Sequence, residues 1–90
     1  LKIGEAAIEC LGADLQLELG GRKTLIDGIA QCEAGADYIS RQILTEILAD
    51  TEEHIDFLEA QFKLIEQLGE PNYLQSAMTE IAPDRSATGN

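Results

Sequence analysis

The chain has 90 residues, and its 17 acidic against 6 basic side chains give a formal net charge of −11. A chain of this length forms one small domain or part of one. Because phosphate recognition needs clustered Lys and Arg, the composition argues against a nucleic-acid partner. The acidity is compatible with bound metal ions, and the alternative interpretation is that it only keeps an exposed surface soluble.

The first third of the chain has the pattern of an amphipathic helix. Apolar residues recur at steps of three and four, which is typical of one helix face. Gly20-Gly21 interrupts the pattern at a cost of about 1 kcal/mol per glycine relative to Ala, but the phase is the same on both sides. We therefore predict one continuous helix over about 5–34, ended by Gly35 as a residue with positive φ. The apolar series is Ile8, Leu11, Leu15, Leu19, Ile26 and Ile29.

A second long helix is predicted over about 37–68, with Asp37 as its N-cap and Gly69 at its end. A short third helix over 71–78 and a disordered tail over 79–90 follow. The short turn makes the two long helices antiparallel neighbours. Both apolar faces are too broad for one helix pair to cover, so we expect further helices to cover them. The second series is Ile39, Ile43, Ile47, Leu58, Gln61 and Ile65.

The cysteines and the hydropathy pattern bear on location. Cys10 and Cys32 fall on one predicted helix, about 33 Å apart along its axis. A disulfide needs Cα atoms within about 7 Å, so the two thiols do not pair within the chain. Reduced thiols are typical of cytoplasmic proteins. No apolar run approaches the length of a membrane span, so no membrane partner is expected.

Two residues in the apolar series carry possible site chemistry. Glu18 falls within the first series and His54 within the second. A buried carboxylate needs a partner, and a metal ion suits both a carboxylate and a neutral imidazole. Two alternatives stay open: a hydrogen-bonded core histidine, and an ion pair between Glu18 and Arg22 one turn on. Asp50, one turn before His54, is placed to orient the imidazole through a hydrogen bond.

Four segments occur in one order and one register: 14–19 (DLQLEL), 37–41 (DYISR), 52–59 (EEHIDFLE) and 72–75 (NYLQ). Together they resemble the bacterioferritin family. The resemblance runs from about Ile3 to Met78. It implies an all-α, ferritin-like four-helix bundle, of which residues 1–78 form the C-terminal antiparallel helix pair plus a short terminal helix. The missing N-terminal helix pair is then an expected partner.

The resemblance also implies a function. Family members store ferric mineral in a shell of 24 subunits, and a haem b group lies between paired subunits, held by a Met from each. That Met is expected outside this chain, because Met78 does not match it. Asp56, Asn72 and Gln75 match positions that line channels of the shell, and the alternative is that they are ordinary exposed polar residues.

The resemblance further implies a di-iron centre that oxidises Fe(II) with dioxygen. Such centres take a Glu from each of two helices and a Glu-x-x-His from each of the other two. Glu18 matches a single Glu and His54 matches a His, so both are expected iron ligands. Thr51 stands where the Glu of Glu-x-x-His is expected, and Arg22 stands where a small residue is expected. A neutral hydroxyl and a fixed cation both weaken an iron site. Asp50 or Thr51 is the residue that could take the place of the missing Glu as a ligand.

Three functional hypotheses follow. The leading one is iron storage by a shell subunit whose own ferroxidase centre is degraded. The second is a non-catalytic subunit, haem-binding or structural, of a mixed shell. The third is a helical interaction module without metal. The first two differ in whether this chain oxidises Fe(II) as an enzyme. Thr51 leaves that question open, because it stands where a ligand Glu is expected.

Overall fold

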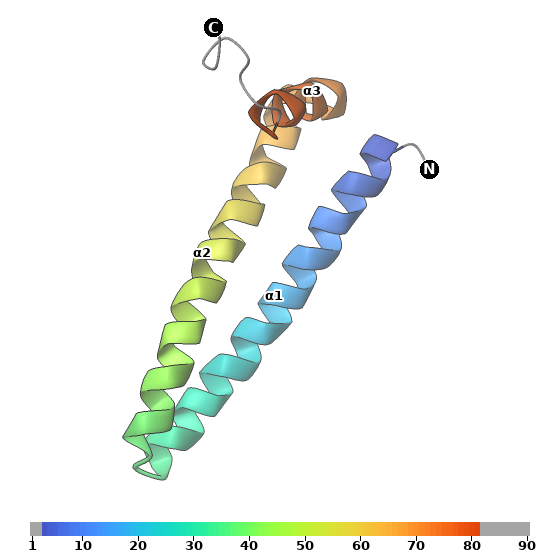
Figure 1. Ribbon diagram of the computed structural model, residues 1–90. Coiled ribbons are helices and arrows are strands. Elements are labelled where there is room, and N and C mark those ends of the chain that lie inside the picture. The colour runs from blue at the N-terminus through green and yellow to red at the C-terminus, as the bar shows by residue number, and fades with distance from the viewer. Residues whose placement is uncertain (1–2, 82–90) are drawn as a thin grey trace, which may run out of the picture.

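The computed structural model describes residues 3–81, with side chains from Gly4 to Ala77. The described part consists of three helices: α1 (Ile3–Ala34), α2 (Tyr38–Leu68) and α3 (Glu70–Ile81). α1 and α2 run antiparallel beside each other, and α3 lies across the end of α2 (Figure 1). The predicted all-α helix pair with a short third helix is therefore confirmed.

The helix ends agree with the sequence prediction to within three residues. α1 is continuous through Gly20-Gly21, as predicted, and begins two residues earlier than expected. α3 continues to Ile81, three residues beyond its predicted end, because no helix-breaking residue occurs before Pro83. The rest of the predicted tail, 82–90, lies outside the described residues. None of the described helices contains an apolar stretch long enough to cross a lipid bilayer.

The turn between α1 and α2 differs from the prediction in one respect. The residue with positive φ is Ala36, at 56°, and Gly35 is not in that region. Asp37 N–H donates to the Cys32 carbonyl at 2.8 Å, and Ala36 N–H donates to the Glu33 carbonyl at 3.2 Å. These two bonds are those of a Schellman motif, which puts the left-handed residue one position after Gly35. The prediction of positive φ at Gly35 was wrong, because it relied only on the general preference for glycine after the end of a helix.

The start of α2 follows the prediction. The Asp37 carboxylate accepts a hydrogen bond from Ser40 N–H at 3.1 Å, as an N-cap does. This bond holds the pKa of Asp37 below its ordinary value of 3.8. At the other end, Gly69 has φ 80° and its N–H donates to the Ile65 carbonyl. A residue with a Cβ adopts that φ only with strain, so Gly69 is suited to end α2.

α1 and α2 pack through one stripe of residues on each helix, spaced alternately by three and four, which is the spacing for side-by-side helix packing. We call these two stripes the inner seams. Beside the α1 stripe, two half-buried glycines receive side chains of α2: Phe62 lies against Gly12, and Leu44 lies against Gly28. This antiparallel register places the middle of α1 level with the middle of α2. The inner seams, all buried or half-buried, are Gly4, Ile8, Leu11, Leu15, Glu18, Arg22, Leu25, Ile29 and Cys32 on α1, and Leu44, Leu48, Thr51, Ile55, Leu58, Phe62 and Ile65 on α2.

α3 is fixed to the wide end of the helix pair by Tyr73. This side chain is buried, and its hydroxyl donates to Gln61 Oε1 at 2.8 Å. Leu74 reaches the start of α1 so closely that a Cβ at Gly4 would collide with Leu74 Cδ1. The short helix therefore closes the end at which α1 and α2 diverge (Figure 1).

The fold leaves most of its apolar surface exposed. Among the described side chains only Ile55, Leu58 and Tyr73 are buried. Burying a Leu or Ile contributes about 1.5–3 kcal/mol, so much of the available hydrophobic stabilisation is not realised within one chain. This confirms the expectation that a lone helix pair leaves its broad apolar faces wet. The exposed large apolar residues are Leu17, Ile26, Tyr38, Ile39, Ile43, Ile47, Phe57, Leu64 and Leu68.

The left-handed Ala36 leads to a prediction. Replacing Ala36 with glycine removes the steric strain of a Cβ at positive φ, so Ala36→Gly is expected to stabilise the fold by about 0.5–1 kcal/mol. Urea unfolding at fixed protein concentration measures the change. Ala30→Gly, within α1, is the control and is expected to destabilise by about 1 kcal/mol. A loss of stability in Ala36→Gly would contradict the turn geometry.

The Asp37 cap leads to a prediction about pH. Because the pKa of Asp37 is lower in the folded than in the unfolded state, its carboxylate stabilises α2 above pH 3.8, and this contribution disappears as the pH falls through the folded pKa. In Asp37→Asn the amide oxygen still accepts the Ser40 N–H but does not titrate. The stability of the wild type relative to Asp37→Asn should therefore fall between pH 5 and pH 2 in thermal unfolding. A constant difference would exclude a charged cap.

Candidate metal site

The two expected ligands lie at the same level of the helix pair. Glu18 is half-buried at the middle of the α1 inner seam, and the register places it level with Ile55. His54, the residue before Ile55, lies beside the α2 inner seam, with 46% of its side chain exposed. The helix pair thus brings a carboxylate and an imidazole from two helices to one level.

The carboxylate nearest His54 comes from α1. His54 Nε2 lies 3.9 Å from Asp14 Oδ2, which makes an ion pair when the imidazole is protonated. The His54 ring also stacks on Phe57, with centroids 6.3 Å apart and planes at 13°. The sequence analysis missed Asp14. Its position one turn before Glu18 was visible, but the contact depends on the register between two helices.

Arg22 does not pair with Glu18. Arg22 Nη1 lies 3.4 Å from Glu52 Oε1, and the two side chains are 42% and 50% exposed. The alternative of an ion pair between Arg22 and Glu18 is therefore not the arrangement found, because the long Arg22 side chain reaches across to α2. A pair this exposed contributes at most about 1 kcal/mol. Within the described residues, Glu18 has no hydrogen-bond or ion-pair partner.

The donors of one chain do not complete a metal site. Among the described residues no group of three or more His, Cys, Asp or Glu side chains is arranged to hold a metal ion. The oxygen and nitrogen donors of Glu18 and His54 suit iron and related transition metals. They are two of the six side chains that a di-iron centre of this class takes, so such a centre would need ligands from further helices.

The other candidate residues are spread over the molecule. Asp50 and Asp56 are exposed on α2, whereas Thr51 is half-buried in the inner seam. Asn72 is exposed, and its Nδ2 donates to the Leu68 carbonyl at 3.0 Å, which caps the end of α2. Gln75 is exposed on α3. The roles assigned to these five residues stay predictions.

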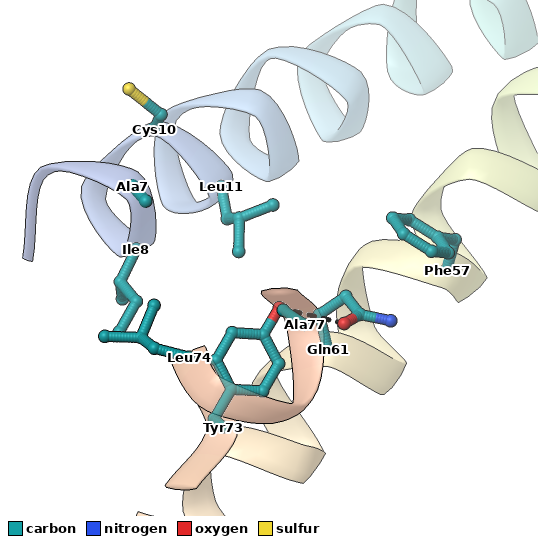
Figure 2. Close-up of a pocket in the computed structure, with 9 residues that line it drawn as sticks. All are labelled: Ala7, Ile8, Cys10, Leu11, Phe57, Gln61, Tyr73, Leu74 and Ala77. Atoms are coloured by element: carbon teal, nitrogen blue, oxygen red, sulfur yellow. Dashed lines mark hydrogen bonds between the residues drawn. The ribbon is translucent and has the colours of Figure 1, made fainter. Parts of the chain in front are cut away.

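A cavity lies away from these ligands, at the end of the helix pair where α3 lies. It measures about 400 Å³, and Ile8 and Leu11 of α1 point across it toward Leu74 and Tyr73 of α3 (Figure 2). Its polar contact is the Tyr73–Gln61 hydrogen bond. An apolar cavity of this kind suits side chains of another helix. The lining residues are Ala7, Ile8, Cys10, Leu11, Phe57, Gln61, Tyr73, Leu74 and Ala77.

The cysteines take no part in the donor pair. Both Cys10 and Cys32 are free thiols, Cys10 exposed and Cys32 half-buried in the inner seam. The prediction that they do not pair within the chain is confirmed.

Comparison with known proteins identifies relatives of this fold and sequence. A family model described as the ferritin-like domain matches residues 2–68. A protein named bacterial ferritin from Neisseria meningitidis is 48% identical over 79 residues, which cover 87% of this chain and 51% of that protein. A bacterial ferritin from Pseudomonas aeruginosa is 51% identical over 74 residues, covering 81% and 48%. A bacterioferritin from Streptomyces coelicolor is 39% identical over 90 residues, covering 100% and 54%.

The chain spans about half the length of the curated relatives it matches. The family match extends over both long helices, and the matching relatives carry the names bacterial ferritin and bacterioferritin. The chain therefore belongs to the ferritin-like domain family, as a member of bacterioferritin type.

Proposed function

We propose that this chain serves iron storage as part of a bacterioferritin subunit, and that Glu18 and His54 are its contribution to an iron-oxidising centre. The observation that carries the proposal is the placement of this carboxylate and this imidazole at one level of two antiparallel helices. Centres of this class take such donors from all four helices of a bundle. Fe(II) and dioxygen are the substrates, and ferric mineral is the product.

The proposed centre is degraded on the side that this chain supplies. Thr51 offers a neutral hydroxyl where a carboxylate would balance the charge of iron, so the half-site carries one negative charge from Glu18. Arg22 adds a fixed cation to the inner seam one turn beyond Glu18, although its guanidinium is held by Glu52. Asp14 on the neighbouring helix lies 3.9 Å from His54 Nε2, where its carboxylate would favour a positively charged imidazole.

The assembly belongs to the same proposal. The subunit joins others in a hollow shell of 24 copies in the cytoplasm, and the helices that cover the exposed apolar faces complete the bundle. Asp56, Asn72 and Gln75 line channels of that shell. Haem b lies between paired subunits, and no residue of this chain is proposed as its ligand.

A second candidate function rests on Thr51 alone. If one missing carboxylate abolishes iron oxidation, the chain is a structural subunit of a mixed shell, and a partner subunit oxidises the iron. The two candidates differ in one measurable respect, the rate of Fe(II) oxidation by assemblies made only of this protein.

Restoring the carboxylate tests the proposal. Anaerobic Fe(II) titration followed by oxygen, monitored by ferric absorbance, is expected to show slow oxidation in the wild-type assembly. Thr51→Glu is expected to accelerate oxidation by about tenfold or more, because losses at such sites typically cost 10–100-fold. Thr45→Glu, which adds the same charge at an exposed threonine of α2, is the matched control and should leave the rate unchanged.

Two results would contradict the proposal. Fast oxidation of two iron ions per wild-type subunit would contradict the hypothesis that the centre is degraded. Iron content that is unchanged in both Glu18→Ala and His54→Ala would remove these residues from iron binding and would favour a helical interaction module without metal.

A further inference from the structure

Arg22 and Thr51 lie opposite each other in the two inner seams. The contacts that the half-buried glycines of α1 make with α2 bring residue 22 level with residue 51. The ion pair agrees with this register, since Arg22 Nη1 lies 3.4 Å from Oε1 of Glu52, the residue after Thr51. The two positions at which this chain departs from the expected di-iron pattern therefore lie at one place in the fold.

We propose that Arg22 takes the place of one metal ion, so that the proposed iron centre holds one ion where a di-iron centre holds two. The proposal rests on the proposed function, because it takes Glu18 and His54 as ligands. It adds the number of ions and assigns a residue to the second position. The remaining ion is bound by Glu18, His54 and ligands from the further helices of the bundle.

The charge balance of the centre supports this proposal. A glutamate at position 51 would add one negative charge, and Thr51 adds none. Arg22 adds one positive charge where a small neutral residue is expected. Together the two departures raise the fixed charge by two, which is the charge of one Fe(II). Because an uncompensated charge inside a covered bundle is costly, the centre is balanced when one divalent ion is left out.

The position of the guanidinium fits the same role. Arg22 lies one helical turn after Glu18 on the same inner seam, about 6 Å along the helix axis. Two metal ions of one centre lie about 3.5–4 Å apart, so Arg22 and an ion bound by Glu18 fall at neighbouring levels. A guanidinium also pairs strongly with carboxylates, often through two parallel hydrogen bonds. It can therefore pair with a carboxylate that a second ion would otherwise bind.

The alternative is that Arg22 and Glu52 form an ordinary exposed ion pair. The other Lys and Arg ion pairs in the described part of the chain join side chains outside the inner seams. Arg22 extends from an inner seam, one turn from Glu18, the only carboxylate among the described inner-seam residues. An ordinary ion pair predicts that the number of bound metal ions does not depend on Arg22.

Zn(II) titration of the assembled protein, followed by calorimetry, counts the ions. Zn(II) serves as the probe because it does not change its oxidation state. The ions of the centre are those lost when Glu18→Ala and His54→Ala are introduced together. We expect one such ion per bundle in the wild type. We expect two in the protein that carries both Arg22→Ala and Thr51→Glu, which removes the cation and restores the carboxylate.

The matched control carries Arg41→Ala and Thr45→Glu, which make the same change in charge at exposed residues of α2. It should keep one ion, as the wild type does. If the protein with Arg22→Ala and Thr51→Glu fails to assemble, Mn(II) electron paramagnetic resonance of the wild type decides. One bound Mn(II) gives the spectrum of an isolated ion, whereas two ions about 3.5–4 Å apart give a spin-coupled spectrum.

Three results would overturn the proposal and leave the proposed function intact: two ions per bundle in the wild type, one ion in the protein with Arg22→Ala and Thr51→Glu, or two ions in the control. A different result separates the two proposals. If the wild type loses no ion when Glu18→Ala and His54→Ala are introduced, these residues are not ligands, and the proposed function fails together with the single-ion centre.

Discussion

One constraint governs this molecule: α2 presents two apolar seams, and the chain contains one long helix to cover them. The inner seam of α2 packs against α1. The second seam of α2, which we call the outer seam, is exposed, and its apolar members are Ile43, Ile47, Phe57, Leu64 and Leu68. Among the described side chains only Ile55, Leu58 and Tyr73 are buried, so much of the available hydrophobic stabilisation is not realised within the chain. The fold therefore depends on a second helix pair that packs against the first, whether from a longer chain or from another copy.

The same constraint decides the chemistry. His54 is a member of the outer seam, and Glu18 lies level with it in the inner seam. A helix that covers the outer seam also closes over these donors and excludes water from them. In the proposed iron centre, covering the apolar surface would also complete the ligand set, because among the described residues no group of three or more donors is arranged to hold a metal ion. Asp14 lies 3.9 Å from His54 Nε2 and is the carboxylate that the helix register brings to this imidazole.

Local features of this fold could be predicted from the sequence, and features that depend on register could not. The periodicity of α1 was strong enough to indicate a continuous helix through Gly20-Gly21, and Asp37 was recognisable as a cap. Glycine preference misled the prediction at the turn, because the hydrogen bonds from Ala36 and Asp37 moved the left-handed residue past Gly35.

In the candidate site too, local features could be predicted from the sequence and contacts between the helices could not. Glu18 and His54 could be found because each interrupts an apolar series on its own helix. The partners of Arg22 and His54 were missed, since Glu52 and Asp14 are far away in sequence and become neighbours only in one antiparallel register. A single helix pattern contains no information about that register.

The dependence of stability on protein concentration tests this account most directly. If covering the outer seam by association stabilises the fold, thermal unfolding of the chain at concentrations 100-fold apart should differ by about 2.7 kcal/mol in stability, with the higher midpoint at the higher concentration. The account predicts that Ile47→Asp removes this dependence. Cooperative unfolding at one midpoint over the whole concentration range would show that a single helix pair is stable alone and would contradict the account.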